Sequence, residues 1–184
     1  MMNDSLGEAR IEMGRLRGVL EQLGLKYVAL TDQPLGLGIG LQWANEGDAD
    51  RIVVVSIPES SRETVYLTSG VMKDVRQDVR NAVLEVCNRW VSQRPFFPAF
   101  LQEIPELPGD HGIMGERGLA VLIKVSLPVE AFVQMPRFFN AVLPGVPLAA
   151  EKLRIELSTQ AEPQGRPYQW KDLDRLLARS FLST

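Results

Sequence analysis

Proline is distributed very unevenly along this chain of 184 residues. Only Pro34 and Pro58 fall within residues 1–94, whereas the other ten prolines fall within residues 95–184. Because proline fixes φ and lacks a backbone N–H, it interrupts helices and the interior strands of sheets. We therefore expect long regular elements in the first half of the chain and more frequently interrupted ones in the second.

Two long amphipathic helices are predicted, over residues 5–23 and 74–94. In the first, Ser5 followed by Glu8 fits a capping box, and Gly24 stands where a C′ glycine is expected. The second is predicted to start at an Asp74 cap and to end before proline. Their expected apolar faces, at helical spacing, are Leu6, Ala9, Met13, Leu16, Leu20 and Leu23, then Val75, Val79, Ala82, Val83, Val86 and Trp90.

Strand patterns fill the space between and after these helices. Alternating or β-branched runs at residues 26–31, 35–43, 51–57 and 64–70 are joined by short polar turns, which favours an antiparallel meander. In the second run, Gly36, Gly38 and Gly40 leave one face bare, as expected beneath a helix. Two strands follow the second helix, at residues 96–102 and 119–127, and Pro98 places the former at an edge or a bulge.

Three further helices are predicted towards the end of the chain, over residues 128–143, 148–157 and 170–182. Pro136 is expected to kink or shorten the first of them. The fold class is therefore α+β, an antiparallel sheet with the first two helices on one face. We expect a domain over residues 1–143 and a C-terminal helical appendage over residues 144–184.

Composition excludes several classes of function. A net charge of −3 gives no general attraction to phosphate, so no nucleic-acid partner is expected. One cysteine and one histidine exclude disulfide frameworks and the usual multi-ligand metal sites, and no cofactor is predicted. No apolar run approaches 18 residues and the start lacks the apolar core of a signal peptide, so the expected location is cytoplasmic, with no membrane partner.

The candidate catalytic groups lack companions. His111 follows Asp110 and precedes Gly112, but nothing marks a nucleophile or a bound water within its reach. Cys87 falls beside the apolar face of the second helix, which is typical of a small core side chain. The glycine-rich residues 36–40 resemble a phosphate loop only faintly, because no helix start follows them. No catalytic residue is predicted.

Two features favour partner binding. The long predicted loop, residues 103–118, carries large apolar side chains, among them Ile113 and Met114. These side chains either pack on the rest of the domain or bind a partner. The first helix carries Gly14 and Gly18 at helical spacing, a costly choice for a helix interior. Either that helix is loosely held, or a second subunit or a bound segment approaches its glycine side.

The order of elements resembles the superfamily that joins type III secretion chaperones and YbjN-like proteins. The resemblance covers roughly residues 5–143. It is carried by VYLTSG at 65–70, DVRNAVLEVCNRW at 78–90, FFPAF at 96–100, and the strand 119–127 that leads into PVEAF at 128–132. The long loop and the segment after residue 144 depart from the family pattern.

The resemblance implies a small α+β protein, often a homodimer, that binds peptides or partner proteins without catalysis. The predicted function is thus a non-enzymatic chaperone or adaptor for a protein or peptide partner. Two alternatives stay open: a small-ligand-binding or hydrolytic domain that uses the His111 loop, and a structural subunit of a larger assembly.

Overall fold

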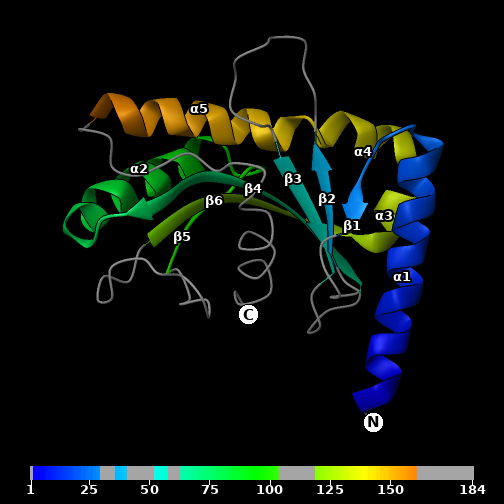
Figure 1. Ribbon diagram of the computed structural model, residues 1–184. Coiled ribbons are helices and arrows are strands. Elements are labelled where there is room, and N and C mark those ends of the chain that lie inside the picture. The colour runs from blue at the N-terminus through cyan, green and yellow to red at the C-terminus, as the bar shows by residue number, and fades with distance from the viewer. Residues whose placement is uncertain (1, 30–35, 41–51, 58–62, 104–118, 161–184) are drawn as a thin grey trace.

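The computed structural model describes residues 2–29, 36–40, 52–57, 63–103 and 119–160. Within these residues a six-stranded antiparallel sheet carries helices along one face and at one end (Figure 1). The elements in chain order are α1 Met2–Gln22, β1 Val28–Ala29, β2 Gly36–Gly40, β3 Ile52–Ser56, β4 Thr64–Val75, the 3-10 turn η1 Gln77–Val79, α2 Arg80–Gln93, β5 Ala99–Glu103, β6 Leu119–Pro128, α3 Val129–Gln134, α4 Pro136–Val142 and α5 Gly145–Gln160.

The strand order is β1-β2-β3-β4-β6-β5, with every neighbouring pair antiparallel. The first four strands form the meander that the short connections predict. After α2 the chain returns as β5 at the edge of the sheet, and β6 then inserts between β5 and β4. The α+β class, the antiparallel sheet and the edge position predicted from Pro98 are confirmed.

Helix α1 ends as its sequence predicts. Gly24 has a φ of +67°, and its N–H donates to the carbonyl of Glu21 at 3.0 Å. The N–H of Leu25 donates to the carbonyl of Leu20 at 2.9 Å, which completes a Schellman motif. The start differs, because α1 begins at Met2 and Ser5 is already helical.

The start of the second helix was wrong in the sequence prediction. Strand β4 continues through Val75, and α2 begins only at Arg80, after η1. Asp74 lies inside the strand with a φ of +54°, so it is not a helix cap. The cause is long-range: the apolar strand β6 keeps β4 paired as far as Val75↔Leu119, through two register shifts. Ala82, expected to be buried, is exposed.

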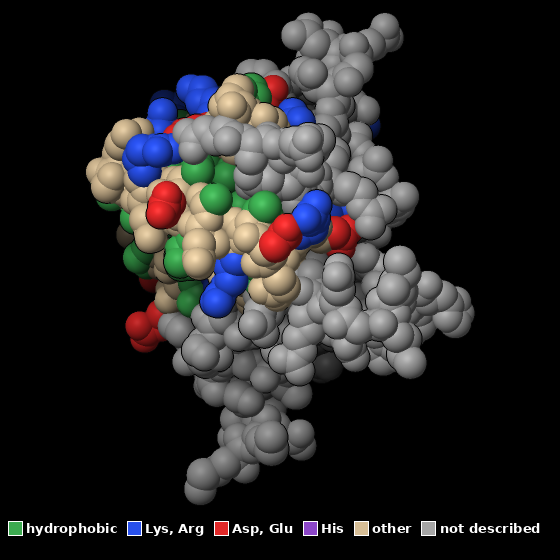
Figure 2. Space-filling view, turned by 90° about the vertical axis from the view of Figure 1, so that its left-hand side faces the viewer, with side chains coloured by type: hydrophobic (Ala, Val, Ile, Leu, Met, Phe, Trp, Pro, Cys, Tyr) green, Lys and Arg blue, Asp and Glu red, His purple; other side chains and the backbone are tan. Residues whose placement is uncertain are grey.

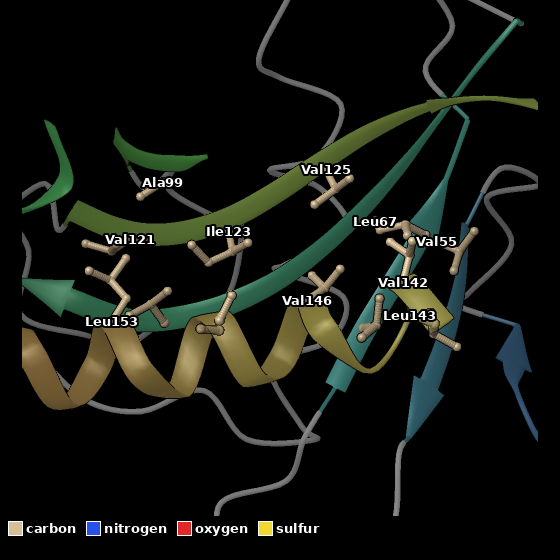
Figure 3. Packing of buried hydrophobic residues seen from close by; sticks show 14 of the residues in the cluster. Val55, Leu67, Ala99, Val121, Ile123, Val125, Val142, Leu143, Val146 and Leu153 are labelled. Atoms are coloured by element: carbon tan, nitrogen blue, oxygen red, sulfur yellow. The ribbon is translucent and has the colours of Figure 1, made fainter. Parts of the chain in front are cut away.

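The predicted helix over residues 128–143 is divided at Pro136 into α3 and α4, as expected. The predicted appendage is corrected in part. Helix α5 packs its buried face on the sheet, and Figure 3 shows Val146 and Leu153 directed towards the strand residues Val121, Ile123 and Val125. Residues 145–160 therefore belong to the domain and its core. Residues 161–184, including the predicted terminal helix, lie outside the described residues.

The helices are arranged differently from the prediction. Helices α2 and α5 cover one face of the sheet, whereas α1 lies beside the sheet and packs on α3 (Figure 1). Met13, Leu16 and Leu20 of the predicted α1 stripe are buried there. Arg15 forms an ion pair with Glu130 of α3 at 2.8 Å, and that guanidinium lowers the pKa of the Glu130 carboxyl.

Leu20→Ala should destabilise the protein by about 2–5 kcal/mol, because the fully buried side chain would leave a cavity where α1 meets the core. Urea denaturation measures this. The matched control is Ile11→Ala on the same helix, at a side chain 64% exposed, which should stay within about 0.5 kcal/mol of the parent. Equal losses at both positions would mean that α1 is not held as described.

Candidate partner-binding site

Three of the residues singled out from the sequence, Ile113, Met114 and His111, lie outside the described residues, as does the predicted loop from residue 104 onward. The expectation that this loop either packs on the domain or binds a partner therefore stays a prediction. The same holds for the alternative that uses His111.

Gly14 and Gly18 lie in the part of α1 that the structure describes. A Cβ atom built on either glycine would meet no atom of the described residues within 4 Å. No described segment of the chain therefore makes the close approach that these glycines permit. Both interpretations of the glycine side, a loosely held helix and a contact with a second subunit or bound segment, stay open.

Cys87 is a buried side chain of the core, as its position on α2 predicts. Burial raises the pKa of its thiol to about 11, and the negative charge of Glu156 adds to the effect. The thiolate is the reactive form of cysteine. Near neutral pH this thiol is therefore protonated and a poor nucleophile.

The structure exposes one group of apolar side chains that the sequence pattern did not single out as a site. Among the described residues the large exposed ones are Ile11, Leu84, Phe96, Phe100, Met135, Phe138 and Ile155. Phe100, in β5, is 45% exposed, and Phe96, in the turn before that strand, is 48% exposed; β5 is the last of the described strands in the sheet. Exposed aromatic side chains beside a strand edge are a candidate surface for binding another chain.

Contacts in the turn between α2 and β5 hold Phe96 in place. The indole N–H of Trp90 donates a hydrogen bond to the carbonyl of Phe97 at 2.8 Å. The Phe97 ring lies against Gly145 of α5, where an added Cβ would stand 2.8 Å from its Cζ atom. Phe96 then stacks edge-to-face on Phe97, with ring centroids 5.1 Å apart, and remains exposed. The buried Trp90 and the partly buried Phe97 thus fix the position of their exposed neighbour Phe96.

The hydrogen-bond pattern shows which backbone groups of β5 face outward. The N–H of Lys124 donates to the carbonyl of Pro98 at 3.2 Å, so these two opposed residues form a hydrogen-bonded pair. In an antiparallel ladder such pairs alternate with pairs that are not bonded to each other. Phe100 therefore directs its N–H and C=O groups towards β6. Ala99 and Leu101 direct theirs away from the sheet.

The charge around α2 and the end of α5 carries no single sign. In Figure 2, which shows this side of the molecule, hydrophobic side chains lie among lysines and arginines and among acidic side chains. Arg89 pairs with Glu156 at 3.1 Å across the two helices. No basic stripe for a phosphate backbone is formed by the residues described here.

In the described part of the chain, no group of three or more His, Cys, Asp or Glu side chains could hold a metal ion. No helix among these residues is long and apolar enough to cross a membrane.

No family model matches the sequence, and no curated protein matches it at a significant level. Among solved structures, YbjN from E. coli, provisionally described as a transcription regulator, is similar to this chain with a TM-score of 0.49 and 14% sequence identity. The match covers 77% of this chain and 90% of that one. At these values no residue role, partner or activity of this chain follows from the match.

The double change Gly14→Ala, Gly18→Ala should stabilise the protein by about 1–2 kcal/mol, because alanine favours the helix and the added methyl groups meet open space. Gly145→Ala is the matched control in α5 and should destabilise, because its methyl group would collide with Phe97. Thermal denaturation at several protein concentrations distinguishes the two interpretations of the glycine side. A double variant that is less stable, or that dissociates a dimer, would assign this side of α1 to a second subunit.

Proposed function

We propose that this protein is a non-enzymatic adaptor or chaperone that binds an extended segment of a partner protein at the edge of strand β5. The proposal rests on one observation: β5 is the last of the described strands in the sheet, and Phe100 in this strand and Phe96 in the turn before it are exposed. A strand added to a sheet edge gains backbone hydrogen bonds, while neighbouring side-chain surfaces supply specificity.

The backbone geometry of β5 suits this mode of binding. Ala99 and Leu101 offer outward N–H and C=O groups, and each typical hydrogen bond contributes about 0.5–1.5 kcal/mol. Trp90, Val86 and Cys87 of α2 are buried behind the strand, so the edge is supported by packed core. A firmly held edge is expected to bind without first becoming ordered, which reduces the entropic cost of binding.

The chemistry of the partner follows from the two aromatic rings. Full burial of a phenylalanine side chain contributes about 1.5–3 kcal/mol, of which roughly half is still to be gained at each half-exposed ring. Side chains alternate between the faces of a strand, so the partner segment should carry apolar residues at alternate positions. A low net charge on the segment suits the mixed charges around this surface.

The resemblance to YbjN-like proteins and the glycines of α1 bear on the oligomeric state, the location and the precise role of the protein. A homodimer, a cytoplasmic location and a chaperone role in the strict sense stay predictions. If a second subunit is present, the glycine side of α1 is the surface that would receive it, because its backbone is open to close approach. That side is distinct from the β5 edge, so both contacts can be tested independently.

The double change Phe96→Ser, Phe100→Ser tests the proposal against an array of 12-residue peptides with apolar residues at alternate positions. We expect the parent to bind a subset of these peptides and the variant to bind them about thirtyfold more weakly, since two half-exposed rings no longer become buried. The melting temperature should change little. Fluorescence titration with the selected peptides measures the affinity.

The matched control is Leu84→Ser, Ile155→Ser, at exposed positions of α2 and α5. It removes two exposed apolar side chains from elsewhere on the surface and should leave peptide affinity unchanged. The proposal is wrong if the parent binds no peptide of the array, or if the control loses as much affinity as the phenylalanine variant.

A further inference from the structure

The face of the sheet opposite α2 and α5 is buried, although none of the described helices lies on it. Residues on this face alternate with those that point into the main core. Val54, Ala120 and Leu122 are at most 1% exposed, yet they are not part of the core cluster on the helix side. Ser56 and Thr68, on the same face, are fully buried. We call these five residues and their neighbours Tyr66 and Lys124 the second face.

The register confirms that the second face is continuous. Val54 pairs with Thr68, and Thr68 pairs with Lys124 on the far side of β4. Leu122 lies opposite both Gly70 and Phe100. The face therefore extends across β3, β4 and β6 and reaches a half-exposed margin at Phe100.

The burial requires a cover that the described helices do not supply. Helices α2 and α5 lie on the other face, and α1, α3 and α4 gather at one end of the sheet (Figure 1). Burial also lowers the pKa of Lys124, whose Nζ atom lies 3.8 Å from the centre of the Tyr66 ring. The cover of the second face must therefore come from outside the described residues.

The surface chemistry of the second face suits an apolar helix. The side of the face beside β3 is low in relief, because Gly38 and Gly36 of β2 pair with Val54 and Ser56. Bare backbone of this kind lets another element approach closely. The hydroxyl oxygen of Ser56 is buried without a hydrogen-bond partner, which is expected beneath a cover that presents hydrocarbon and no polar group.

We propose that the chain's own C-terminal segment, residues 170–182, docks on the second face as an amphipathic helix. Leu173, Leu176, Leu177 and Phe181 fall on one side of such a helix. Thirteen residues would make a helix of about 20 Å, comparable to the width of the four strands β3, β4, β6 and β5 at about 4.8 Å per strand.

The connection is long enough for this arrangement. Helix α5 ends at Gln160, and residues 161–169 follow before the predicted helix. Nine extended residues reach about 30 Å, whereas crossing from the helix layer to the far side of the sheet requires about 20 Å. Residues 104–118 are the weaker candidate, because two prolines and several glycines prevent one continuous helical stripe there.

A thiol placed on the second face tests the docking in the full-length chain. Ser56→Cys changes one oxygen to sulfur at a fully buried position of the face, and the native Cys87 serves as an internal reference in the core on the other side. Mass spectrometry after treatment with a thiol reagent measures the two sites separately. In the Ser56→Cys protein both thiols should be protected.

The change Leu176→Asp, Leu177→Asp, added to Ser56→Cys, places two charges on the apolar side of the segment. Labelling at position 56 should then accelerate by about a hundredfold or more, while Cys87 stays protected. The matched control Arg175→Asp, Arg179→Asp introduces two aspartates on the opposite side of the same helix and should leave labelling slow. Unchanged labelling at position 56 in the leucine variant would overturn the proposal.

A second measurement covers the case in which the leucine variant unfolds and both thiols react. A photo-crosslinking p-benzoylphenylalanine in place of Tyr66, in the otherwise unchanged chain, should attach to peptides from residues 172–184. Attachment to residues 104–118, or to a second molecule, would show that another segment covers the second face and would overturn the proposal. Neither measurement depends on peptide binding at β5, so failure here and failure of the proposed function are distinguishable.

Discussion

The pairing of β4 with β6 is the interaction on which the rest of the structure depends. It extends from Thr64↔Pro128 to Val75↔Leu119 and joins segments more than forty residues apart in the chain. All seven residues from Leu119 to Val125 are buried, so β6 is covered on both faces, as in the centre of a layered domain. The meander attaches to β4 on one side, and β5 attaches to β6 on the other.

This central pair also explains how the helices are placed. Helix α5 packs on β4 and β6, and α2 packs behind β5 and alongside α5. Because α5 occupies the middle of the face, α1 is held at the end of the sheet against α3. The exposed aromatic surface at β5 is a consequence of the same arrangement: Trp90 and Phe97 fill the space between α2 and α5, and Phe96 is left outside.

The sequence was informative where local chemistry decides the structure. The Schellman end of α1 at Gly24, the break at Pro136 and the edge position of the strand after Pro98 each follow from one residue type with a fixed backbone preference. It was misleading where distant residues decide. Asp74 does not cap a helix, because β4 continues past it to the pairing of Val75 with Leu119. The segment after residue 144 is not a separate appendage, because Val146 and Leu153 of α5 are buried against the sheet.

The candidate site was predictable only in part. Apolar periodicity finds the buried side of an element, but exposure of Phe96 and Phe100 depends on Phe97 being the ring that meets Gly145. Nothing in the local pattern FFPAF decides which of two adjacent phenylalanines turns inward. Pro98 was the one available signal, because it indicated an edge strand, and edges are where partners add.

Residue-by-residue amide hydrogen exchange of β5, measured by NMR with and without a bound peptide from the array, tests the central claim most directly. In the free protein the outward N–H of Leu101 should exchange quickly and the N–H of Phe100, bonded to β6, slowly. Peptide binding by strand addition should slow exchange at Leu101 and leave Phe100 unchanged. A peptide that binds while Leu101 continues to exchange quickly would contradict the account.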